Sequence, residues 1–252
     1  MPALRVYRSP WRDFPDVVVQ TTIAKLKAHS DYPNAKAGDP ESGIRVVSDL
    51  LKPGKVTFKI DVIVPVLQLD ANKRNSIPIS YAALLATELK VPVSANVLQI
   101  NQVSHTGADA ASRILGQPIF DGKIQAGTRV LLVDDVVTYG STIANLRGWL
   151  AHQGVTVVGS TSMAAAFGAT KLVPPAEVVE RLSSRFPGEV QQLADNLGFD
   201  VRTFTNREAR YLGEIKTLET FQSLVQASAR IREVTRSLSR GTDVQRSWEQ
   251  ER

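Results

Sequence analysis

The sequence contains no cysteine, and its three histidines, His29, His105 and His152, lie far apart. The absence of cysteine excludes disulfide scaffolds, thiolate catalysis, iron–sulfur clusters and thiolate zinc sites, and it is typical of a reducing compartment. No two histidines have the spacing of paired metal ligands. A histidine metal centre is therefore not expected, and the fold must be held together by an apolar core.

Long apolar runs are also lacking. The longest, such as residues 62–67, fall well short of the roughly 20 residues that a membrane-spanning helix requires. The first residues carry Arg5 and Arg8 without an apolar segment after them, so the pattern of a secretory signal is not met. We expect no membrane segment and a cytoplasmic protein.

The overall composition is ordinary. Hydrophobic residues make up 43% and charged residues 22% of the 252 residues, as in folded globular proteins large enough to bury a core. The 30 Lys and Arg against 25 Asp and Glu give a net charge of +5. This excess permits nucleic acid or phosphate-rich partners, although a small positive excess is more often a matter of solubility alone.

The hydrophobic pattern divides the chain into three parts. Residues 1–54 are a predicted N-terminal helical extension, with helical runs over residues 17–28 and 44–51 and a polar turn over residues 31–42. Residues 55–170 alternate β-branched segments with helical runs, which predicts an α/β core with a parallel sheet. Its strands are expected over residues 59–66, 96–100, 129–134 and 155–159, and its helices over residues 81–90 and 142–152.

The third part, residues 171–252, is predicted to be a mostly helical C-terminal subdomain. Its expected elements are helices over residues 176–186, 189–197, 206–212 and 214–238, a strand over 200–204 and a polar, frayed end over 240–252. Arginines follow at four-residue steps, at Arg232, Arg236 and Arg240. They form either the solvated edge of a packed amphipathic helix or a surface for a partner or a nucleic-acid backbone.

The most informative segment is RVLLVDDVVTYGST, residues 129–142, in which a buried strand runs into two acids and then into a hydroxyl-rich turn that opens a helix. Free N–H groups and the helix dipole at such a turn favour an anion, and the hydroxyls of Thr138, Ser141 and Thr142 are further donors. Gly140 allows the backbone to approach a ligand closely. A phosphate group fits this turn.

The two acids, Asp134 and Asp135, would repel the same phosphate, so they are expected to face another part of the ligand. Ionised carboxylates only accept hydrogen bonds, and the vicinal hydroxyls of a sugar are paired donors. The implied ligand is a ribose 5-phosphate, with Mg²⁺ held by the acids and hydroxyls directly or through water. Alternatively, the acids merely end a strand and the hydroxyl residues are N-caps. Neither GxxxxGK[ST] nor GxG occurs, which disfavours the common nucleotide-binding folds.

Residues 130–142 resemble the signature with which type I phosphoribosyltransferases bind phosphoribosyl diphosphate (PRPP): four hydrophobic residues, two acids and a Thr/Gly-rich turn. The order of strands and loops resembles that family over residues 60–167. Residues 75–120, with YAALLATEL and QPIF, are similar to the ComF-like branch linked to DNA uptake. The resemblance implies an α/β fold: a parallel-sheet type I phosphoribosyltransferase core with helical N- and C-terminal additions.

The resemblance also implies roles for single residues. In the family the two acids bind the ribose 2′ and 3′ hydroxyls, which falls here on Asp134 and Asp135. The following turn binds the 5-phosphate, and the corresponding residues are Val137, Thr138, Tyr139, Gly140, Ser141 and Thr142. Tyr139 departs from the family, which commonly has a small residue there, and its ring would narrow the site or stack on a base.

Two further loops are implied. The loop after the first core strand would bind pyrophosphate, with Lys73 and Arg74 as cations and Asp70 as a further Mg²⁺ ligand. Alternatively, these are solvated loop and turn residues. A hood that closes over the site would contain His105, as an acid/base or diphosphate contact, and Arg113. Alternatively, the histidine lies on the surface and the arginine caps or pairs locally.

The resemblance implies transfer of phosphoribose from PRPP to a nitrogenous acceptor, by displacement at C1 with release of pyrophosphate. Segments beyond residue 158, including Phe167, would select an acceptor that the residues do not identify. Two other hypotheses stay open: a PRPP-sensing regulator that binds RNA or DNA with little turnover, and an accessory module of a DNA-uptake, mobile-element or defence system with a protein partner. A homodimer is also compatible, because dimers are common in the family.

Overall fold

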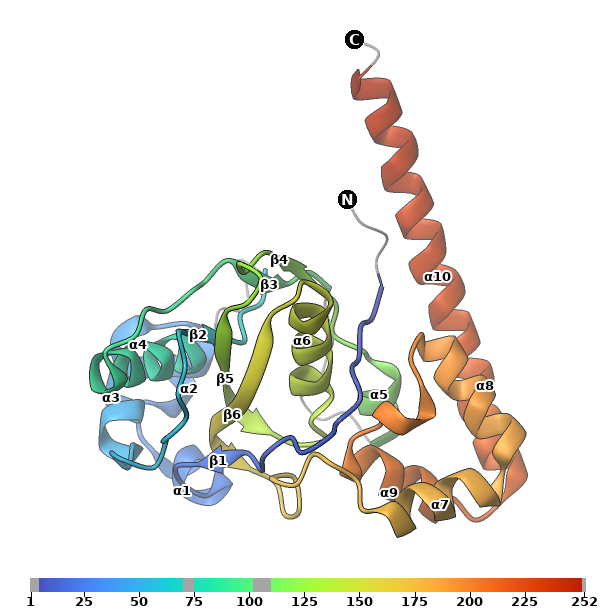
Figure 1. Cartoon of the computed structure of the whole chain (residues 1–252), viewed down its shortest axis with the longest axis horizontal. Coiled ribbons are helices and arrows are strands. Elements are labelled where there is room, and N and C mark those ends of the chain that lie inside the picture. Colours follow the sequence, from blue (N-terminus) through green and yellow to red (C-terminus); the bar gives the residue numbers. More distant parts are fainter. Residues whose placement is uncertain (1–4, 70–74, 102–109, 251–252) are drawn as a thin grey trace.

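The computed structural model describes residues 5–69, 75–101 and 110–250, with side chains as far as residue 234. Figure 1 shows its elements. In chain order they are β1 (Val18–Val19), α1 (Ile23–Ala28), α2 (Tyr32–Ala37), α3 (Pro40–Leu50), β2 (Val62–Pro65), α4 (Ile77–Leu89), β3 (Val97–Gln99), α5 (Ala110–Leu115), β4 (Phe120–Gly122), β5 (Arg129–Val137), α6 (Ser141–His152), β6 (Thr156–Ala165), α7 (Ala176–Arg185), α8 (Pro187–Leu197), a 3₁₀ turn (Val201–Thr203), α9 (Asn206–Glu214) and α10 (Leu218–Gln250).

Four strands form one parallel sheet in the order β1-β6-β5-β2. Strand β2 pairs in register with residues 130–133 of β5, and β5 continues along β6 as far as the pair Val137 and Ala165. All of β2 and residues 130–135 of β5 are buried, as expected for strands covered on both faces. The predicted α/β class with a parallel sheet is confirmed.

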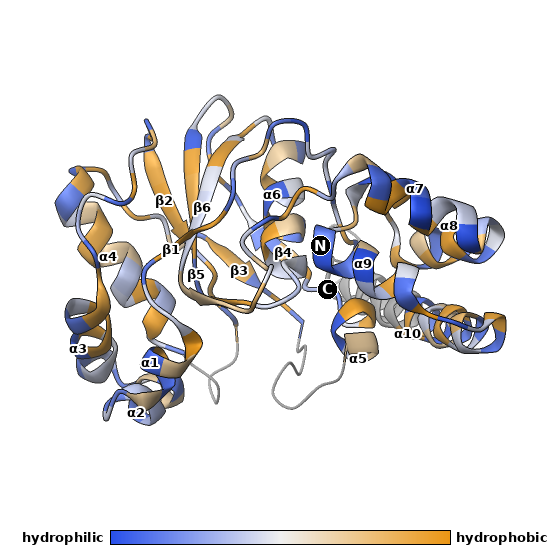
Figure 2. Cartoon of the chain, turned by 90° about the horizontal axis from the view of Figure 1, so that it is seen from below, coloured by the Kyte–Doolittle hydropathy of each residue, from blue (hydrophilic) through white to orange (hydrophobic). Residues whose placement is uncertain are grey.

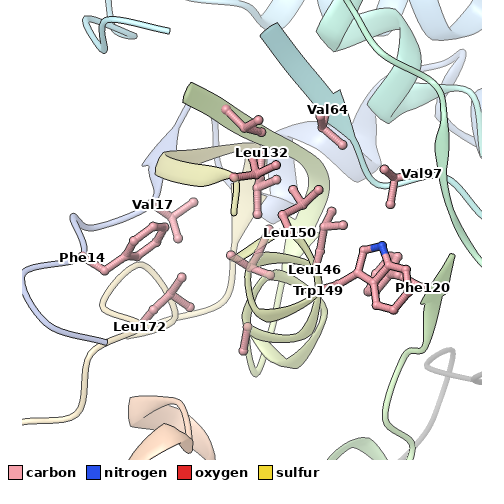
Figure 3. Packing of buried hydrophobic residues seen from close by; sticks show 14 of the residues in the cluster. Phe14, Val17, Val64, Val97, Phe120, Leu132, Leu146, Trp149, Leu150 and Leu172 are labelled. Carbon is pink, nitrogen blue, oxygen red and sulfur yellow. The ribbon is translucent and has the colours of Figure 1, made fainter. Parts of the chain in front are cut away.

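Helices cover both faces of this sheet. Successive side chains of a strand point to opposite faces, so neighbouring residues of β5 pack against different helices. On one face Leu132 of β5 shares an apolar cluster with Leu146 and Leu150 of α6 (Figure 3). On the other face Leu131 of β5 belongs to a second cluster with Tyr81 of α4. Figure 2 shows the hydrophobic central strands between these helix layers. The buried sheet provides the rigid support for the segment that follows β5.

The helix predicted over residues 17–28 is wrong in its first half. Val18 and Val19 form strand β1, which pairs with Thr161 and Ser162 of β6 at the edge of the sheet. Consecutive β-branched residues fit such a pleated, partly buried edge better than a helix. Helix α1 begins only after this strand.

The polar turn predicted over residues 31–42 instead contains α2 and the start of α3. Pro33 lies in the first turn of α2, where an N–H group is not needed, and Gly38, with a φ of 104°, ends the helix. Asp39 then caps α3 by accepting a hydrogen bond from the backbone N of Ser42 at 2.8 Å. The turn-forming composition belongs to the caps of two short helices.

The strand predicted over residues 96–100 is present as β3, residues 97–99, but its expected place in the parallel sheet is wrong. Strand β3 pairs antiparallel with β4 in a separate two-stranded sheet. The outer edge of β2 is hydrogen-bonded to residues 92–94, and Gln99 of β3 forms a parallel bridge only with Gln68, after β2 has ended. Gly122 of β4, with a φ of 115°, leaves no room for a Cβ atom against the carbonyl of Asn96.

Helices α7 to α10 enclose a third apolar cluster, which includes Leu193, Phe204, Leu212 and Phe221. In Figure 1 these helices lie beside α6, on the side of it away from β5. Within the described residues, none of the helices combines the length and the hydropathy needed to cross a membrane. Ile114 of α5 also belongs to the third apolar cluster, so the C-terminal helices pack against α5 as well as against one another.

Two expectations about the C-terminal part are wrong. Residues 200–204 form a 3₁₀ turn instead of a strand, because the carboxylate of Asp200 accepts from the backbone N of Arg202 at 2.8 Å and caps the turn. Helix α10 is longer than predicted and includes most of the segment 240–252, ending at Gln250. It extends well beyond the body of the protein (Figure 1).

Candidate functional site

Two adjacent acids lie near the carboxyl end of β5, at the edge where open parallel sheets bind ligands. Asp134 and Asp135 retain only 8% and 9% of their exposure. The strand ends shortly afterwards, at Val137, and Asp134 lies beside Ser162 of β6. The sheet therefore holds two carboxylates side by side in a place that removes most of their hydration.

The backbone around the acids fixes both carboxylates. The N–H of Asp135 donates to Oδ1 of Asp134 at 2.8 Å, and the N–H of Val136 donates to Oδ1 of Asp135 at 2.7 Å. Burial, with the charge of Asp135, raises the pKa of Asp134 well above its ordinary value. Asp134 is therefore protonated at a higher pH than a solvent-exposed aspartate.

Two side chains from distant parts of the chain meet Asp135. Its Oδ2 atom accepts from Nζ of Lys36 at 2.7 Å and from Nδ2 of Asn75 at 2.8 Å. Burial lowers the pKa of Lys36. The charge and hydrogen bond of Asp135 outweigh this effect, so that the net shift of the pKa is upward. Sequence reasoning missed both residues, because no local pattern connects them with the acids.

The turn after β5 has the backbone shape that was expected of an anion site. Gly140 has a φ of 82° and precedes Ser141, the first residue of α6. A Cβ atom on Gly140 would lie 2.4 Å from Cδ2 of Leu172, so both conformation and packing require glycine. The first N–H groups of a helix have no partners within it, and α6 begins six residues after Asp135. Thr138 and Thr142 are partly exposed beside them.

Helix α9 supports this turn from behind. The hydroxyl of Thr205 donates to the carbonyl O of Tyr139, and the hydroxyl of Ser141 donates to Oε1 of Glu208, each at 2.5 Å. The hydroxyl proton of Ser141 is used by Glu208, so this hydroxyl is not the donor to an anion that the sequence predicted. The backbone N–H of Ser141 is the group of this residue that is suited to donate to an anion. The guanidinium of Arg207 lies 4.9 Å from the centre of the Tyr139 ring, which packs against α9.

Glu208 is fully buried and paired with Arg8 from the N-terminal segment. Nη1 and Nη2 of Arg8 donate to the two carboxylate oxygens at 2.6 and 2.8 Å. Burial raises the pKa of Glu208. The charge and hydrogen bonds of Arg8, with the hydrogen bonds from Ser141 and Thr205, together lower this pKa by more, so that the net shift is downward. Arg8 also donates to Asn145 of α6 and to Gln117. The sequence signal that could have indicated part of this cluster is the capping box of Thr205 and Glu208.

Of the residues predicted for the hood, Arg113 reaches the turn. Its Nη1 atom donates to the hydroxyl of Thr138 at 3.2 Å, so α5 and the turn are joined directly. The predicted residues Asp70, Lys73, Arg74 and His105 lie outside the described residues. The structure thus brings together the turn after the acids and Arg113 of α5.

Loops at the same edge of the sheet expose two large apolar side chains. Leu69, after β2, is 66% exposed and Phe167, after β6, is fully exposed. The backbone N of Ala166 donates to the carbonyl O of Val137 at 2.8 Å, which ties the loop of Phe167 to the end of β5. An aromatic ring is therefore presented close to the carboxyl end of β5.

The acid pair has some of the features of a metal site. Within the described residues, no three His, Asp or Glu side chains gather as a metal cage. Mg²⁺ in phosphate sites is usually held by one or two carboxylates together with ligand oxygens and water. Asp134 and Asp135 match this donor set, although one oxygen of Asp135 already accepts from Lys36. The pair fits a metal shared with a bound ligand.

Comparisons with known proteins give relatives by sequence. No protein-family model matches the chain. It is 30% identical over 232 residues to Protein TraN of Escherichia coli, and the matched segment covers 89% of this chain and 52% of TraN. It is 32% identical over 154 residues to an uncharacterized protein of Haemophilus influenzae, which covers 58% of this chain and 34% of that protein. The chain thus spans about half or less of the length of these relatives.

The solved structures that are similar include adenine phosphoribosyltransferases. The enzyme from Leishmania tarentolae matches 64% of this chain and 85% of its own, with 17% identity and a TM-score of 0.33. The enzyme from Trypanosoma brucei, in complex with AMP, pyrophosphate and ribose-5-phosphate, matches 50% and 53%, with 16% identity and a TM-score of 0.32. A likeness of this degree leaves the function to be argued from the residues of the site.

Proposed function

We propose that this protein is a phosphoribosyltransferase that binds PRPP with Mg²⁺ and transfers phosphoribose to a nitrogenous acceptor, with release of pyrophosphate. The observation that carries the proposal is the end of β5, where two buried acids, Asp134 and Asp135, are followed directly by a glycine turn into α6. One half of this arrangement accepts hydrogen bonds and the other half donates them. A ribose 5-phosphate has the matching halves, a vicinal diol and a phosphate.

The phosphate half of the ligand fits the turn. The N–H groups of Gly140 and Ser141 and the dipole of α6 favour a dianion, and the hydroxyls of Thr138 and Thr142 are donors beside them. The guanidinium of Arg113 adds positive charge next to the turn, because it donates a hydrogen bond to the Thr138 hydroxyl. All these groups favour negative charge at the same end of the site.

The acid half of the site fits the sugar and its reaction. The acceptor nitrogen forms a bond to C1 as the bond from C1 to the diphosphate oxygen breaks, and the acceptor then loses its proton to solvent. The sugar passes through an oxocarbenium-like state, whose positive charge the carboxylate of Asp135 stabilises at close range. No side-chain nucleophile is needed, because orientation and electrostatics supply most of the catalysis.

Mg²⁺ and the remaining cations act on the leaving group. When bound, Mg²⁺ neutralises charge on the departing diphosphate. Asp134 and Asp135 would hold it together with ligand oxygens. Lys73, Arg74 and His105 stay candidates for contacts to the diphosphate, as the family resemblance implies.

The acceptor is proposed to bind near Phe167. The exposed ring of Phe167 follows Ala166, whose backbone N–H is hydrogen-bonded to the carbonyl O of Val137 at the end of β5. Planar nitrogen bases stack on aromatic rings, so this ring is a suitable platform.

A second function would use the same ligand site for sensing. The observation that favours it is α10, a helix of 33 residues that extends beyond the body of the protein, which binding of PRPP does not require (Figure 1). In that case PRPP binding would act on a nucleic acid or protein partner with little turnover. The ComF-like relationship, a DNA-uptake or defence role and a homodimer stay predictions of the same kind.

The proposal is tested by binding and turnover with the full chain. We expect isothermal calorimetry to show binding of PRPP and of ribose 5-phosphate in the presence of Mg²⁺, and pyrophosphate release with at least one member of a panel of nitrogenous bases. The double variant Asp134→Asn, Asp135→Asn should lose both activities. Asp195→Asn, on the exposed side of α8, removes a carboxylate elsewhere and should behave as wild type.

Two results would decide against it. If the wild-type protein binds neither PRPP nor any ribose monophosphate with Mg²⁺, the site has been misinterpreted. Binding that shifts affinity for RNA or DNA without pyrophosphate release would favour the sensing function instead.

A further inference from the structure

The N-terminal segment contributes a cation to the acid pair. Helix α2 places Nζ of Lys36 at 2.7 Å from Oδ2 of Asp135, across 99 residues of sequence. The Lys36 side chain is 40% exposed and that of Asp135 is 13% exposed. The ammonium therefore sits at the mouth of the acid pair, between the buried carboxylates and solvent.

The position of Lys36 is set by hydrogen bonds between α2 and the start of α4. The backbone N of Ser76 donates to the carbonyl O of Ala35 at 3.0 Å, and its hydroxyl donates to the carbonyl O of Asp39 at 2.7 Å. Gly43 of α3 packs against Ser76 so closely that a Cβ atom would lie 2.5 Å from the hydroxyl. Such packing holds the end of α2 in one place relative to the sheet.

Asp135 does not need Lys36 to keep its orientation. Asn75 donates to the same Oδ2 atom at 2.8 Å, and the N–H of Val136 donates to Oδ1 at 2.7 Å. Asn75 is itself fixed, since its Oδ1 atom accepts from the backbone N of Ile77 at the start of α4. The carboxylate is thus held from both sides, and the lysine is left with a further role.

An ammonium group has three N–H donors, and Asp135 takes one of those on Lys36. Two adjacent carboxylates repel a polyanionic ligand, and a cation in contact with them reduces that repulsion. In PRPP the diphosphate is attached to C1, next to the carbon that bears the 2′-hydroxyl. If the acids accept from the ribose hydroxyls, the first phosphate lies within reach of a cation bonded to one of them.

We propose that Lys36 binds the diphosphate of PRPP, so that the N-terminal segment completes the ligand site of the core. This inference rests on the proposed function and goes beyond it, because the phosphoribosyl signature of β5 and α6 does not contain the lysine. Lys36 distinguishes PRPP, which has the diphosphate, from ribose 5-phosphate, which lacks it.

The test compares these two ligands by calorimetry, with Mg²⁺ in each case, on wild type, Lys36→Met and Lys36→Arg. We expect Lys36→Met to weaken PRPP binding by about tenfold or more, as for loss of a charged hydrogen bond. Binding of ribose 5-phosphate should change by less than about twofold, because Asn75 and Val136 still hold Asp135. Lys36→Arg keeps the charge and should retain most of the affinity for PRPP.

Lys27→Met serves as the matched control, since it removes an exposed lysine from the neighbouring helix α1 and should leave both affinities unchanged. Thermal unfolding checks that each variant is folded, and Lys36→Gln is a second neutral variant should the methionine prove disruptive. If Lys36→Met weakens the binding of both ligands equally, or the binding of neither, the role of Lys36 in diphosphate binding is overturned. A wild-type protein that binds neither ligand would overturn the proposed function itself, and with it this inference.

Discussion

The carboxyl group of Asp134 is buried beside the charge of Asp135, and both influences raise its pKa well above the ordinary value. A group whose pKa is higher in the folded than in the unfolded chain stabilises the fold at low pH. This contribution is lost as the pH rises through the raised pKa. At neutral pH, above the ordinary pKa of an aspartate, the burial of Asp134 therefore lowers the stability of the fold, and such shifted groups are often found at functional sites.

Replacement of Asp134 by asparagine should stabilise the protein at neutral pH. The amide oxygen of Asp134→Asn can still accept from the N–H of Asp135, and an amide pays no penalty for ionising in a buried place, so we expect a gain on the order of 1 kcal/mol in the free energy of unfolding. At about pH 4 the difference from wild type should shrink, because the wild-type carboxyl is then protonated. Urea unfolding at both pH values measures this, with Asp195→Asn as the exposed control. A variant that is less stable than wild type at neutral pH would contradict the assigned cause.

At the scale of elements, the junction of β5 and α6 is held between the sheet and α9. Strand β5 and helix α6 are local structures whose apolar periodicity is visible in the chain, and both were predicted within a few residues. Their support by Thr205 and Glu208 was not predicted, because the partners are 66 and 67 residues away. The motif is thus local, whereas the packing that keeps it in shape is not.

The substitution Gly140→Ala tests this close packing. The left-handed backbone penalises any side chain there, and a Cβ atom would also collide with Leu172, so a loss of roughly 3 kcal/mol in the free energy of unfolding is expected. Affinity for ribose 5-phosphate should fall as well, because the turn must shift.

Gly198→Ala is the matched control for that variant. Gly198 has a similar φ of 87° but no atom within 4 Å of a Cβ, so only the backbone penalty of about 1 kcal/mol applies and ligand affinity should not change. Urea unfolding and calorimetry measure the two effects. Equal losses of stability in both variants would show that packing against Leu172 contributes nothing.

At the scale of the whole molecule, Arg8 joins three parts of the chain. It donates to Asn145 in α6, to Gln117 before β4 and to Glu208 in α9, and its guanidinium lies 4.0 Å from the centre of the Phe199 ring. The N-terminal segment passes between α6 and the C-terminal helices (Figure 1). One buried arginine thus couples α6, the segment before β4 and the C-terminal part.

Loss of that arginine should be felt throughout the protein. Arg8→Met leaves Glu208 buried without its counter-ion, so we expect a loss of roughly 3–5 kcal/mol in the free energy of unfolding and weaker binding of ribose 5-phosphate through Ser141. Arg5→Met removes an exposed arginine from the same segment and should change stability by less than about 0.5 kcal/mol. Denaturant unfolding compares the two. A loss below about 1 kcal/mol for Arg8→Met would mean that the pair is dispensable.

The parts of this protein that depend on neighbours along the chain could be predicted from the order of the residues. The apolar run of β5, the acids after it and the glycine before α6 act within one strand, one turn and one helix, so their periodicity and turn chemistry could be interpreted without coordinates. The same reasoning failed at Val18 and Val19, where an edge of β6 decided between strand and helix.

The surroundings of those parts depend on contacts between distant segments of the folded chain. Lys36 and Asn75 reach Asp135, and Arg8 reaches Glu208, across 60 to 200 residues of chain. No local spacing encodes such contacts, because they depend on how helices pack on the sheet and on which buried charges can be paired there. The chemistry of the site is therefore visible in one short segment, while its charge balance and its rigidity come from the fold.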